Sequence, residues 1–227
     1  MIDPKNLEVP TTIESIRDIV PKVKQIIFKP DAGKFNFKAG QFVMGEFPDR
    51  FNPGKTIKRA YSISSSPFED EMIELCVTCL DNGNASFFIC EELQAGKPFL
   101  WKGPYGKFGL PDHVSGRLIF IATGTGITPL RSMFRQLLHD SYQDEILFFH
   151  GCRFDGDHPY FDEMKDLERK HSNFKFYPIL SRPEKWTGPK GYVQHLVKDT
   201  LKGNHGLAYI CGVGQMIKDN EDTLKTL

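Results

Sequence analysis

The sequence predicts two domains: an antiparallel β-barrel or sandwich, followed by an α/β domain built on a parallel sheet. Up to about Pro111 the segments are short, rich in β-branched and aromatic residues, and bounded by Pro, Gly, Asn and Asp, which is typical of antiparallel strands. From Arg117 strands alternate with helices, which indicates a parallel sheet with right-handed crossovers. The boundary is expected in Leu110–Gly116, so that a chain of 227 residues divides into domains at 1–112 and 113–227.

In the N-terminal half we expect six strands and one short helix, Ala85–Leu93. The strands are Thr11–Ile19, Lys22–Phe28, Gln41–Phe47, Arg59–Ser64, Met72–Cys79 and Pro98–Lys102.

In the C-terminal half we expect four strands that alternate with helices. The strands are Arg117–Ala122, Glu145–His150, Phe174–Leu180 and Ala208–Cys211. The helices are Pro129–His139, Phe161–Arg169, Val193–Leu201 and a last one that begins at Gln215.

The composition is that of an ordinary globular protein. Hydrophobic residues make up 40% of the chain, and 29 Lys and Arg balance 29 Asp and Glu, which argues against disorder and against nucleic acid or an anionic membrane as a partner. The longest apolar run, Leu118–Ala122, is too short to span a bilayer, so no membrane insertion is expected. Met1–Lys5 lacks the pattern of a secretory signal, and we expect a cytoplasmic protein.

The five cysteines favour a reduced compartment over a disulfide framework, because their number is odd and the chain is long enough to fold without crosslinks. Cys76 and Cys79 have the spacing of half a zinc or redox site, but they lie in a predicted strand, where residues three apart point to opposite faces. The seven histidines show no HExxH or similar spacing. We therefore expect no metal site.

A glycine-rich segment, Gly124-Thr125-Gly126-Ile127-Thr128-Pro129, follows the first parallel strand. A doubly wound sheet binds dinucleotides at such a place, because glycines let the backbone approach a diphosphate and the helix start offers unpaired N–H groups. Pro129 suits the first turn of the helix, and Thr128 is the expected N-cap. The third glycine of the usual fingerprint is absent, so an ordinary tight turn is the alternative interpretation.

The ends of the next two strands carry arginines where a site that prefers NAD usually keeps an acid. The second strand ends in His150-Gly151-Cys152-Arg153, and the third ends in Ser181-Arg182. Because Arg pairs well with phosphate, Arg153, Ser181 and Arg182 favour NADPH, with NADH possible. The alternative is that both arginines are solvated surface residues.

The stretch Arg59-Ala60-Tyr61-Ser62 is the most informative in the first domain. Alternation along a strand places Arg59 and Tyr61 on one face and Ser62 on the other. A cation, an aromatic ring and a hydroxyl in this order could hold a phosphate, cover a flat ring and bond to its edge. The alternative is a surface strand with a chance tyrosine.

The chain from about Thr11 to Thr226 resembles the ferredoxin–NADP reductase family of two-domain flavoenzymes. Five segments in family order carry the resemblance: Arg59–Ser62, Gly83-Asn84-Ala85-Ser86, Gly103-Pro104-Tyr105-Gly106, Gly124–Pro129, and Cys211-Gly212-Val213-Gly214-Gln215-Met216. The resemblance implies that the first domain is a six-stranded antiparallel Greek-key barrel that binds FAD. It implies that the second is an α/β domain that binds the nicotinamide dinucleotide.

The resemblance also implies the roles of individual residues. Ser62 and Cys211 would be the catalytic positions, Ser62 near flavin N5 and Cys211 near nicotinamide C4. The FAD-binding set would be Arg59, Ala60, Tyr61, Ser62, Val77, Gly83, Asn84, Ala85 and Ser86. The nicotinamide-dinucleotide set would be Gly124, Thr125, Gly126, Thr128, Pro129, Arg153, Ser181, Arg182, Gly212 and Met216.

The family pattern implies a flavin-dependent oxidoreductase that takes hydride from NAD(P)H and passes electrons to ferredoxin, flavodoxin or an oxygenase component. The alternatives are an electron-transfer subunit of a larger complex and a nucleotide-binding module without catalysis. A covalent role of Cys211 with a histidine is a further alternative interpretation of that residue.

Two departures from the family pattern stand out. Gly214 replaces the usual proline, and the chain stops about one strand before the family's usual ending, whose aromatic residue covers the flavin. Trp186 is a distant candidate to cover the flavin instead, although a Trp is more often a packing residue.

Overall fold

The computed structural model describes residues 7–203 and 205–227. Met1–Lys5, on which the expectation of no secretory signal depends, lies outside the described residues. The chain divides into two compact units. The first unit is Met1–Leu110 together with Arg131–Gln136, and the second unit is Pro111–Leu130 together with Leu137–Leu227.

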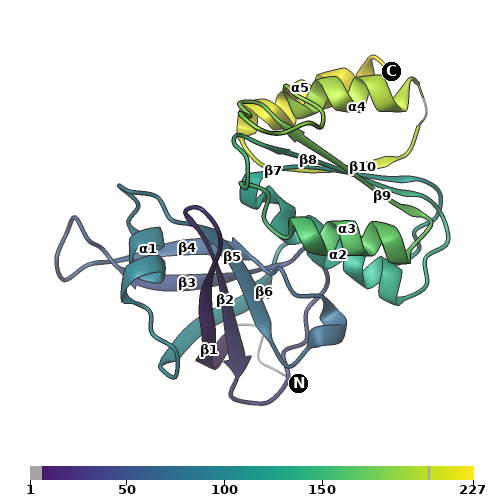
Figure 1. The fold of residues 1–227 in the computed structure, drawn as a ribbon. Helices are drawn as coiled ribbons and strands as arrows, with labels where there is room; N and C mark the ends of the chain where they lie inside the picture. Colours follow the sequence, from purple (N-terminus) through teal and green to yellow (C-terminus); the bar gives the residue numbers. More distant parts are fainter. Residues whose placement is uncertain (1–6, 204) are drawn as a thin grey trace. The chain divides into compact units, whose positions relative to one another are not determined.

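The first unit is built on a six-stranded antiparallel sheet (Figure 1). Its strands are β1 (Glu8–Val20), β2 (Val23–Pro30), β3 (Phe42–Pro48), β4 (Thr56–Ser62), β5 (Ile73–Thr78) and β6 (Pro98–Tyr105). They lie in the order β4-β3-β6-β1-β2-β5. Directly after β4, the Ser64 amide donates a hydrogen bond to the carbonyl oxygen of Glu74 in β5 at 2.7 Å. The two ends of the strand order are thus joined, as in a barrel, and the predicted fold of this half is confirmed.

Most residues of β2 and alternate residues of β3 contribute to the core of this unit. β2 buries Val23, Gln25 and Ile26 before Phe28, and β3 buries alternate residues up to Phe47. Trp101 of β6 is fully buried and meets Phe28 and Phe47 edge to face. Aromatic pairs in this geometry contribute free energy beyond that of burial. The cluster therefore stabilises the sheet next to β4, whose Tyr61 contacts Phe47 and Trp101.

The second unit is a parallel sheet in the order β10-β7-β8-β9, which confirms the predicted α/β fold. Its strands are β7 (Leu118–Thr123), β8 (Ile146–Cys152), β9 (Phe174–Leu180) and β10 (Leu207–Cys211). Helices α4 (Val193–Leu201) and α5 (Gly214–Lys225) cover one face of the sheet, and α2 (Ile127–His139) and α3 (Phe161–Lys170) lie on the other (Figure 1). None of the described helices is both long and apolar enough to cross a membrane.

The helix predicted over Ala85–Leu93 is present over Ala85–Glu92, as one α-turn, α1 (Ala85–Phe87), followed by a π-helical turn, Phe88–Glu92. One local expectation is wrong. Thr128 does not cap α2, because that helix already begins at Ile127 after a short 3₁₀ turn, Gly124–Gly126. The Thr128 hydroxyl instead donates back to the Thr125 carbonyl at 2.6 Å, a bond that competes with capping.

Against the interpretation that the cysteines favour a reduced compartment over a disulfide framework, Cys79 and Cys90 form a disulfide. Cys79 directly follows β5, and Cys90 lies in the π-helical turn, so the fold places their Cα atoms 6.0 Å apart. Cysteine number alone could not reveal this pairing, because the approach depends on how the turn folds back on the strand. The bond closes the segment that holds Gly83 and Ser86.

Candidate functional site

The predicted residues of β4 lie along one edge of the first unit's sheet. Arg59 is exposed. Its guanidinium donates a hydrogen bond to the backbone carbonyl of the neighbouring residue, Lys58, at 2.8 Å. Tyr61 is half-buried and meets Phe47 and Trp101 edge to face. Burial raises the pKa of the Tyr61 phenol to about 12, against an opposing effect of Arg59. Tyr61 is therefore a neutral, fixed ring beside an available cation.

The predicted turn Gly83–Ser86 forms a small cradle. A Cβ atom on Gly83 would lie 1.9 Å from the Ser86 hydroxyl oxygen, so the hydroxyl occupies the space that a side chain at residue 83 would fill. The Ser86 Oγ atom is buried and has no hydrogen-bond partner in the described structure. A buried polar group without a partner is uncommon. At this turn, Gly83 therefore lets a ligand come close to the backbone, and the Ser86 hydroxyl next to it is free to bond to that ligand.

Asn84 ties this turn to the loop between β3 and β4. Its side-chain amide donates to the Asp49 carboxylate at 2.8 Å, and its carbonyl oxygen accepts from the Arg50 amide at 2.9 Å. The Arg50 guanidinium lies over the Phe87 ring, 3.8 Å from its centroid. Sequence reasoning missed Arg50, which lies in a loop without a motif; the structure brings this second cation beside the cradle. Val77 is buried in β5, and Ala85 is buried in α1.

The glycine segment after β7 packs tightly against the end of β10. Gly124 has φ +52°, a left-handed conformation that suits glycine. A Cβ atom on Gly126 would lie 2.3 Å from the Cys211 carbonyl oxygen, and one on Gly212 would lie 2.3 Å from the Thr123 hydroxyl. The Thr123 Oγ1 atom is buried without a partner in the described structure. The structure therefore brings the predicted residues of this loop and of the Cys211–Gly212 turn together.

Cys211 ends β10 and is half-buried, and burial raises the pKa of its thiol. Met216 lies in α5, and a Cβ atom on Gly212 would lie 2.5 Å from its terminal methyl group. A protonated thiol at a strand end is suited to contact and positioning rather than to nucleophilic attack, which requires a thiolate.

The three residues predicted to favour a phosphate also meet. The Arg182 amide donates to the Arg153 carbonyl at 2.8 Å, and the Ser181 amide donates to the Cys152 carbonyl at 3.0 Å. Both arginine side chains are exposed at the carboxyl edge of the sheet. Trp186 instead packs against Phe161 and His158 within the second unit.

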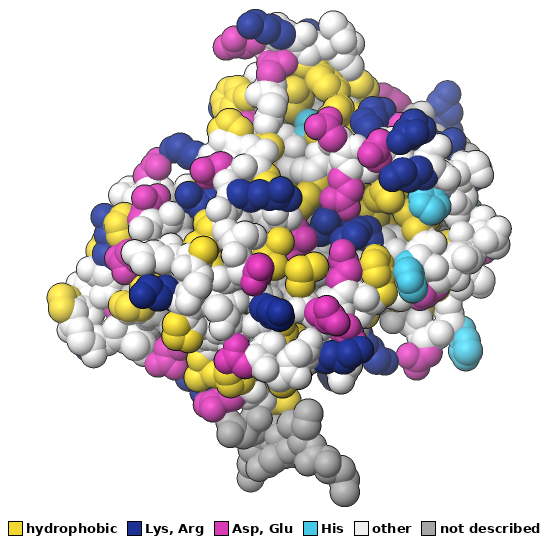
Figure 2. Space-filling model, turned by 60° about the horizontal axis from the view of Figure 1, so that its bottom comes forward, with side chains coloured by type: hydrophobic (Ala, Val, Ile, Leu, Met, Phe, Trp, Pro, Cys, Tyr) yellow, Lys and Arg dark blue, Asp and Glu magenta, His cyan; other side chains and the backbone are white. Residues whose placement is uncertain are grey.

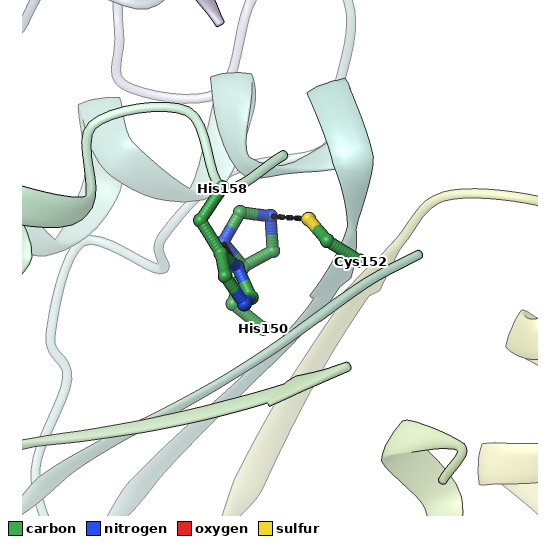
Figure 3. A group of neighbouring side chains, drawn as sticks. All are labelled: His150, Cys152 and His158. Carbon is green, nitrogen blue, oxygen red and sulfur yellow. Dashed lines mark hydrogen bonds between the residues drawn. The ribbon is translucent and has the colours of Figure 1, made fainter. Parts of the chain in front are cut away.

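A cluster that sequence reasoning missed lies next to the glycine segment: His150, Cys152 and His158 (Figure 3). The His150 Nε2 atom is 2.9 Å from the Gly124 carbonyl oxygen and 3.8 Å from the Cys152 sulfur. The Nδ1 atoms of His150 and His158 are 3.3 Å apart. Burial lowers the pKa of His150 to about 4 and that of His158 to about 3, and raises the pKa of the Cys152 thiol to about 12. Only the alternation of His150 and Cys152 in β8 was visible in the sequence; His158 comes from the following loop.

Comparison with known proteins gives matches over both units. Residues 10–109 match the model of the oxidoreductase FAD-binding domain, and residues 120–222 match that of the oxidoreductase NAD-binding domain. Ferredoxin–NADP reductase B of Sorangium cellulosum is 34% identical over 212 residues, which are 89% of this chain and 85% of that protein. The phenol 2-monooxygenase reductase component of a Pseudomonas species is 33% identical over 90% of this chain, but the match spans 58% of that protein's length.

Solved structures show the same fold. A ferredoxin–NADP⁺ reductase from Neisseria gonorrhoeae with bound FAD and NADP superposes with a TM-score of 0.81 at 24% identity, covering 97% of this chain and 91% of that one. A cytochrome P450 reductase from Amycolatopsis superposes with a TM-score of 0.87 at 25% identity, covering 96% of this chain and 66% of that one.

Proposed function

This chain belongs to the ferredoxin–NADP reductase family of FAD- and NAD-binding oxidoreductases, and we propose that it oxidises NADPH through FAD and passes the electrons to a redox protein. FAD, when bound, supplies the group that accepts hydride and releases electrons singly; the protein supplies binding and orientation. Two cradles carry the proposal. In each, a buried hydroxyl without a partner lies where a glycine leaves room: Ser86 beside Gly83, and Thr123 beside Gly212.

The first cradle fits a flavin diphosphate. The Ser86 hydroxyl has a donor to offer, Gly83 lets the backbone approach, and Arg59 and Arg50 carry positive charge on nearby elements. Arg59 would pair with the diphosphate, because guanidinium groups suit phosphate geometry. Tyr61 would cover the flavin ring, and Ser62 would donate a hydrogen bond at its reactive edge.

The second cradle fits the nicotinamide dinucleotide. The turn Gly124–Gly126 leads directly into helix α2, which has Pro129 in its first turn. The backbone N–H groups at the start of a helix attract phosphate. Cys211 would contact the nicotinamide ring as a positioning group, because correct placement of the reacting atoms speeds hydride transfer. We further propose that residues 1–112 form the FAD-binding domain and residues 113–227 the domain that binds the nicotinamide dinucleotide.

The absorption spectrum tests the proposal. We expect a yellow protein whose flavin absorbance is bleached by NADPH, and Arg59→Ala should release FAD on dilution at least tenfold more readily. Lys58→Ala is the matched control, because Lys58 is an exposed cation next to Arg59 on β4. A colourless protein that releases no flavin on denaturation would contradict the proposal. Wild-type protein that binds NADPH but neither oxidises it nor holds flavin would favour the non-catalytic nucleotide-binding module.

For the coenzyme, we propose that Arg153, Ser181 and Arg182 bind a 2′-phosphate. Arg182→Ala should raise the KM for NADPH at least tenfold more than the KM for NADH. Arg169→Ala on α3 is the control, since its guanidinium is exposed and bonded to Asp166. Equal effects of Arg182→Ala on both coenzymes would remove this assignment.

The acceptor is proposed by class: ferredoxin, flavodoxin or an oxygenase component. Figure 2 shows Lys and Arg interspersed with Asp and Glu on the face that it draws, in line with a net charge of zero, so a docking surface would use local rather than bulk charge. The match to a monooxygenase reductase component keeps an electron-transfer subunit as the second candidate. Stopped-flow kinetics would measure how fast the reduced protein transfers electrons to purified ferredoxin, flavodoxin and an oxygenase component. Fast reduction of free ferredoxin or flavodoxin would support the reductase, and fast reduction of the oxygenase component alone would support the electron-transfer subunit.

We also propose a cytoplasmic location. In the cytosol the Cys79–Cys90 pair would be kept reduced, because stable disulfides are rare there. Thiol counting on protein trapped in cells before lysis tests this: five reactive thiols after denaturation support the cytosol, and three contradict it.

A further inference from the structure

The side chains of His150, Cys152 and His158 converge at the carboxyl end of β8. His150 and Cys152 are two residues apart on one strand and so share a face. His158 lies in the loop between β8 and α3, and its ring packs edge to face against the His150 ring (Figure 3). One possible ligand atom from each residue lies within 4.8 Å of the other two.

Hydrogen bonding fixes the tautomers of the two rings. The Gly124 carbonyl can only accept, so His150 carries its proton on Nε2 and offers a lone pair at Nδ1. His158 then donates from Nδ1 to the Nδ1 of His150. The Nε2 atom of His158 is left as a buried acceptor with no partner in the described structure, although the residue is only 5% exposed.

We propose that His150, Cys152 and His158 form a binding site for a thiophilic divalent cation, with Zn²⁺ as the probe. Two imidazoles and one thiolate are a ligand set that zinc accepts, with the fourth position left to water. Zn–N bonds of about 2.0–2.1 Å place two nitrogens of a tetrahedral site about 3.3 Å apart. The two Nδ1 atoms already have this separation of 3.3 Å.

In this site the ion replaces the hydrogen bond between the two histidines. The Nε2–H group of His150 keeps its bond to the Gly124 carbonyl, an outer contact typical of ligating histidines. The Nδ1 proton of His158 moves to Nε2, which then points a donor at no partner among the described residues. The Cys152 sulfur lies 3.8 Å from the Nε2 of His150, so it would have to turn toward the Nδ1 side of the ring, and it would release its thiol proton to solvent on binding the ion.

Zn²⁺ titration of the flavin-loaded protein against a chromophoric chelator tests the proposal. We expect one ion per chain, with affinity reduced at least tenfold in Cys152→Ser and in His158→Gln. Cys211→Ser and His139→Gln are matched controls, since Cys211 is another thiol of the second unit and His139 is an exposed histidine beside Asp140. Co²⁺ in the wild-type protein should give the intense visible bands of tetrahedral coordination, at wavelengths longer than flavin absorption.

Wild-type affinity in the two cluster variants, or loss of binding in His139→Gln instead, would overturn the proposal. Circular dichroism of each variant separates lost binding from lost folding, and Cys152→Ser changes one atom only. The readout needs no turnover, so failure of the proposed reductase activity would leave this test intact.

Discussion

A Cβ atom on Gly126 would lie 2.3 Å from the carbonyl oxygen of Cys211, so the loop after β7 and the end of β10 touch backbone to backbone. The two strands are parallel neighbours, with Cys211 level with Ala122. The carboxyl ends of adjacent parallel strands meet at one edge of the sheet. This contact is what brings the Cys211–Gly212 turn to the glycine segment.

Gly126→Ala should therefore weaken NADPH binding. The added methyl group cannot fit without moving the loop or the strand end, and we expect at least a tenfold rise in Kd, which corresponds to about 1.4 kcal/mol. FAD content should be unchanged, because the residue lies in the second unit. Gly214→Ala is the control, since a Cβ there meets nothing within 4 Å. Equal Kd values for the two variants would contradict the prediction.

Ser86→Ala should have opposite effects on folding and on FAD binding. Removing a buried hydroxyl that has no partner should stabilise the apoprotein by about 1 kcal/mol, whereas FAD loses a hydrogen bond and should bind about tenfold more weakly. Urea unfolding of the apoprotein and flavin fluorescence measure the two. Ser132→Ala is the control: its buried hydroxyl donates to the Ser65 carbonyl at 2.6 Å, so it should only destabilise. The prediction is wrong if Ser86→Ala destabilises the apoprotein to the same extent.

Reduction of the Cys79–Cys90 disulfide should destabilise the first unit. The bond closes a loop with a sequence separation of 11 residues, and releasing such a loop increases the entropy of the unfolded chain, which costs about 3 kcal/mol of stability. FAD should also bind more weakly, because the loop contains Gly83 and Ser86. Urea unfolding with and without reductant measures the change. A Cys79→Ser, Cys90→Ser variant should not respond to reductant; a response there would point to another cause.

Cys211 should react slowly with alkylating agents near neutral pH. Burial raises the pKa of its thiol above the ordinary 9.0, so the thiolate fraction at pH 7–8 is below that of a free cysteine. The alkylation rate, followed by peptide mass spectrometry, should still rise with pH beyond 9. By the same sign, this thiol's contribution to stability is present below pH 9 and is lost as the pH rises through the folded-state pKa. Rapid, pH-independent alkylation at pH 7 would instead support a histidine-activated nucleophile.

Much of the fold could be predicted because its signals are local. Alternation in β3 and the buried runs of β7 and β8 indicate which residues face a core, and glycines and prolines mark where strands end. The register could not be predicted in this way: β1 carries irregularities between Ile13 and Ser15 and between Asp18 and Val20. The π-helical turn at Phe88–Glu92 escaped prediction for a similar reason, since its apolar spacing also suits an α-helix.

The sequence by itself determined the two fold classes, the places of the glycine segments and the order of the family motifs, because each depends on residues close together in the chain. Only the tertiary structure decided which distant groups meet. It paired Cys79 with Cys90, set Gly126 against Cys211, and brought His158 to His150 beside Gly124. Such contacts depend on strand order, register and the return path of loops. No local pattern encodes these, because they are fixed by packing across the whole sheet.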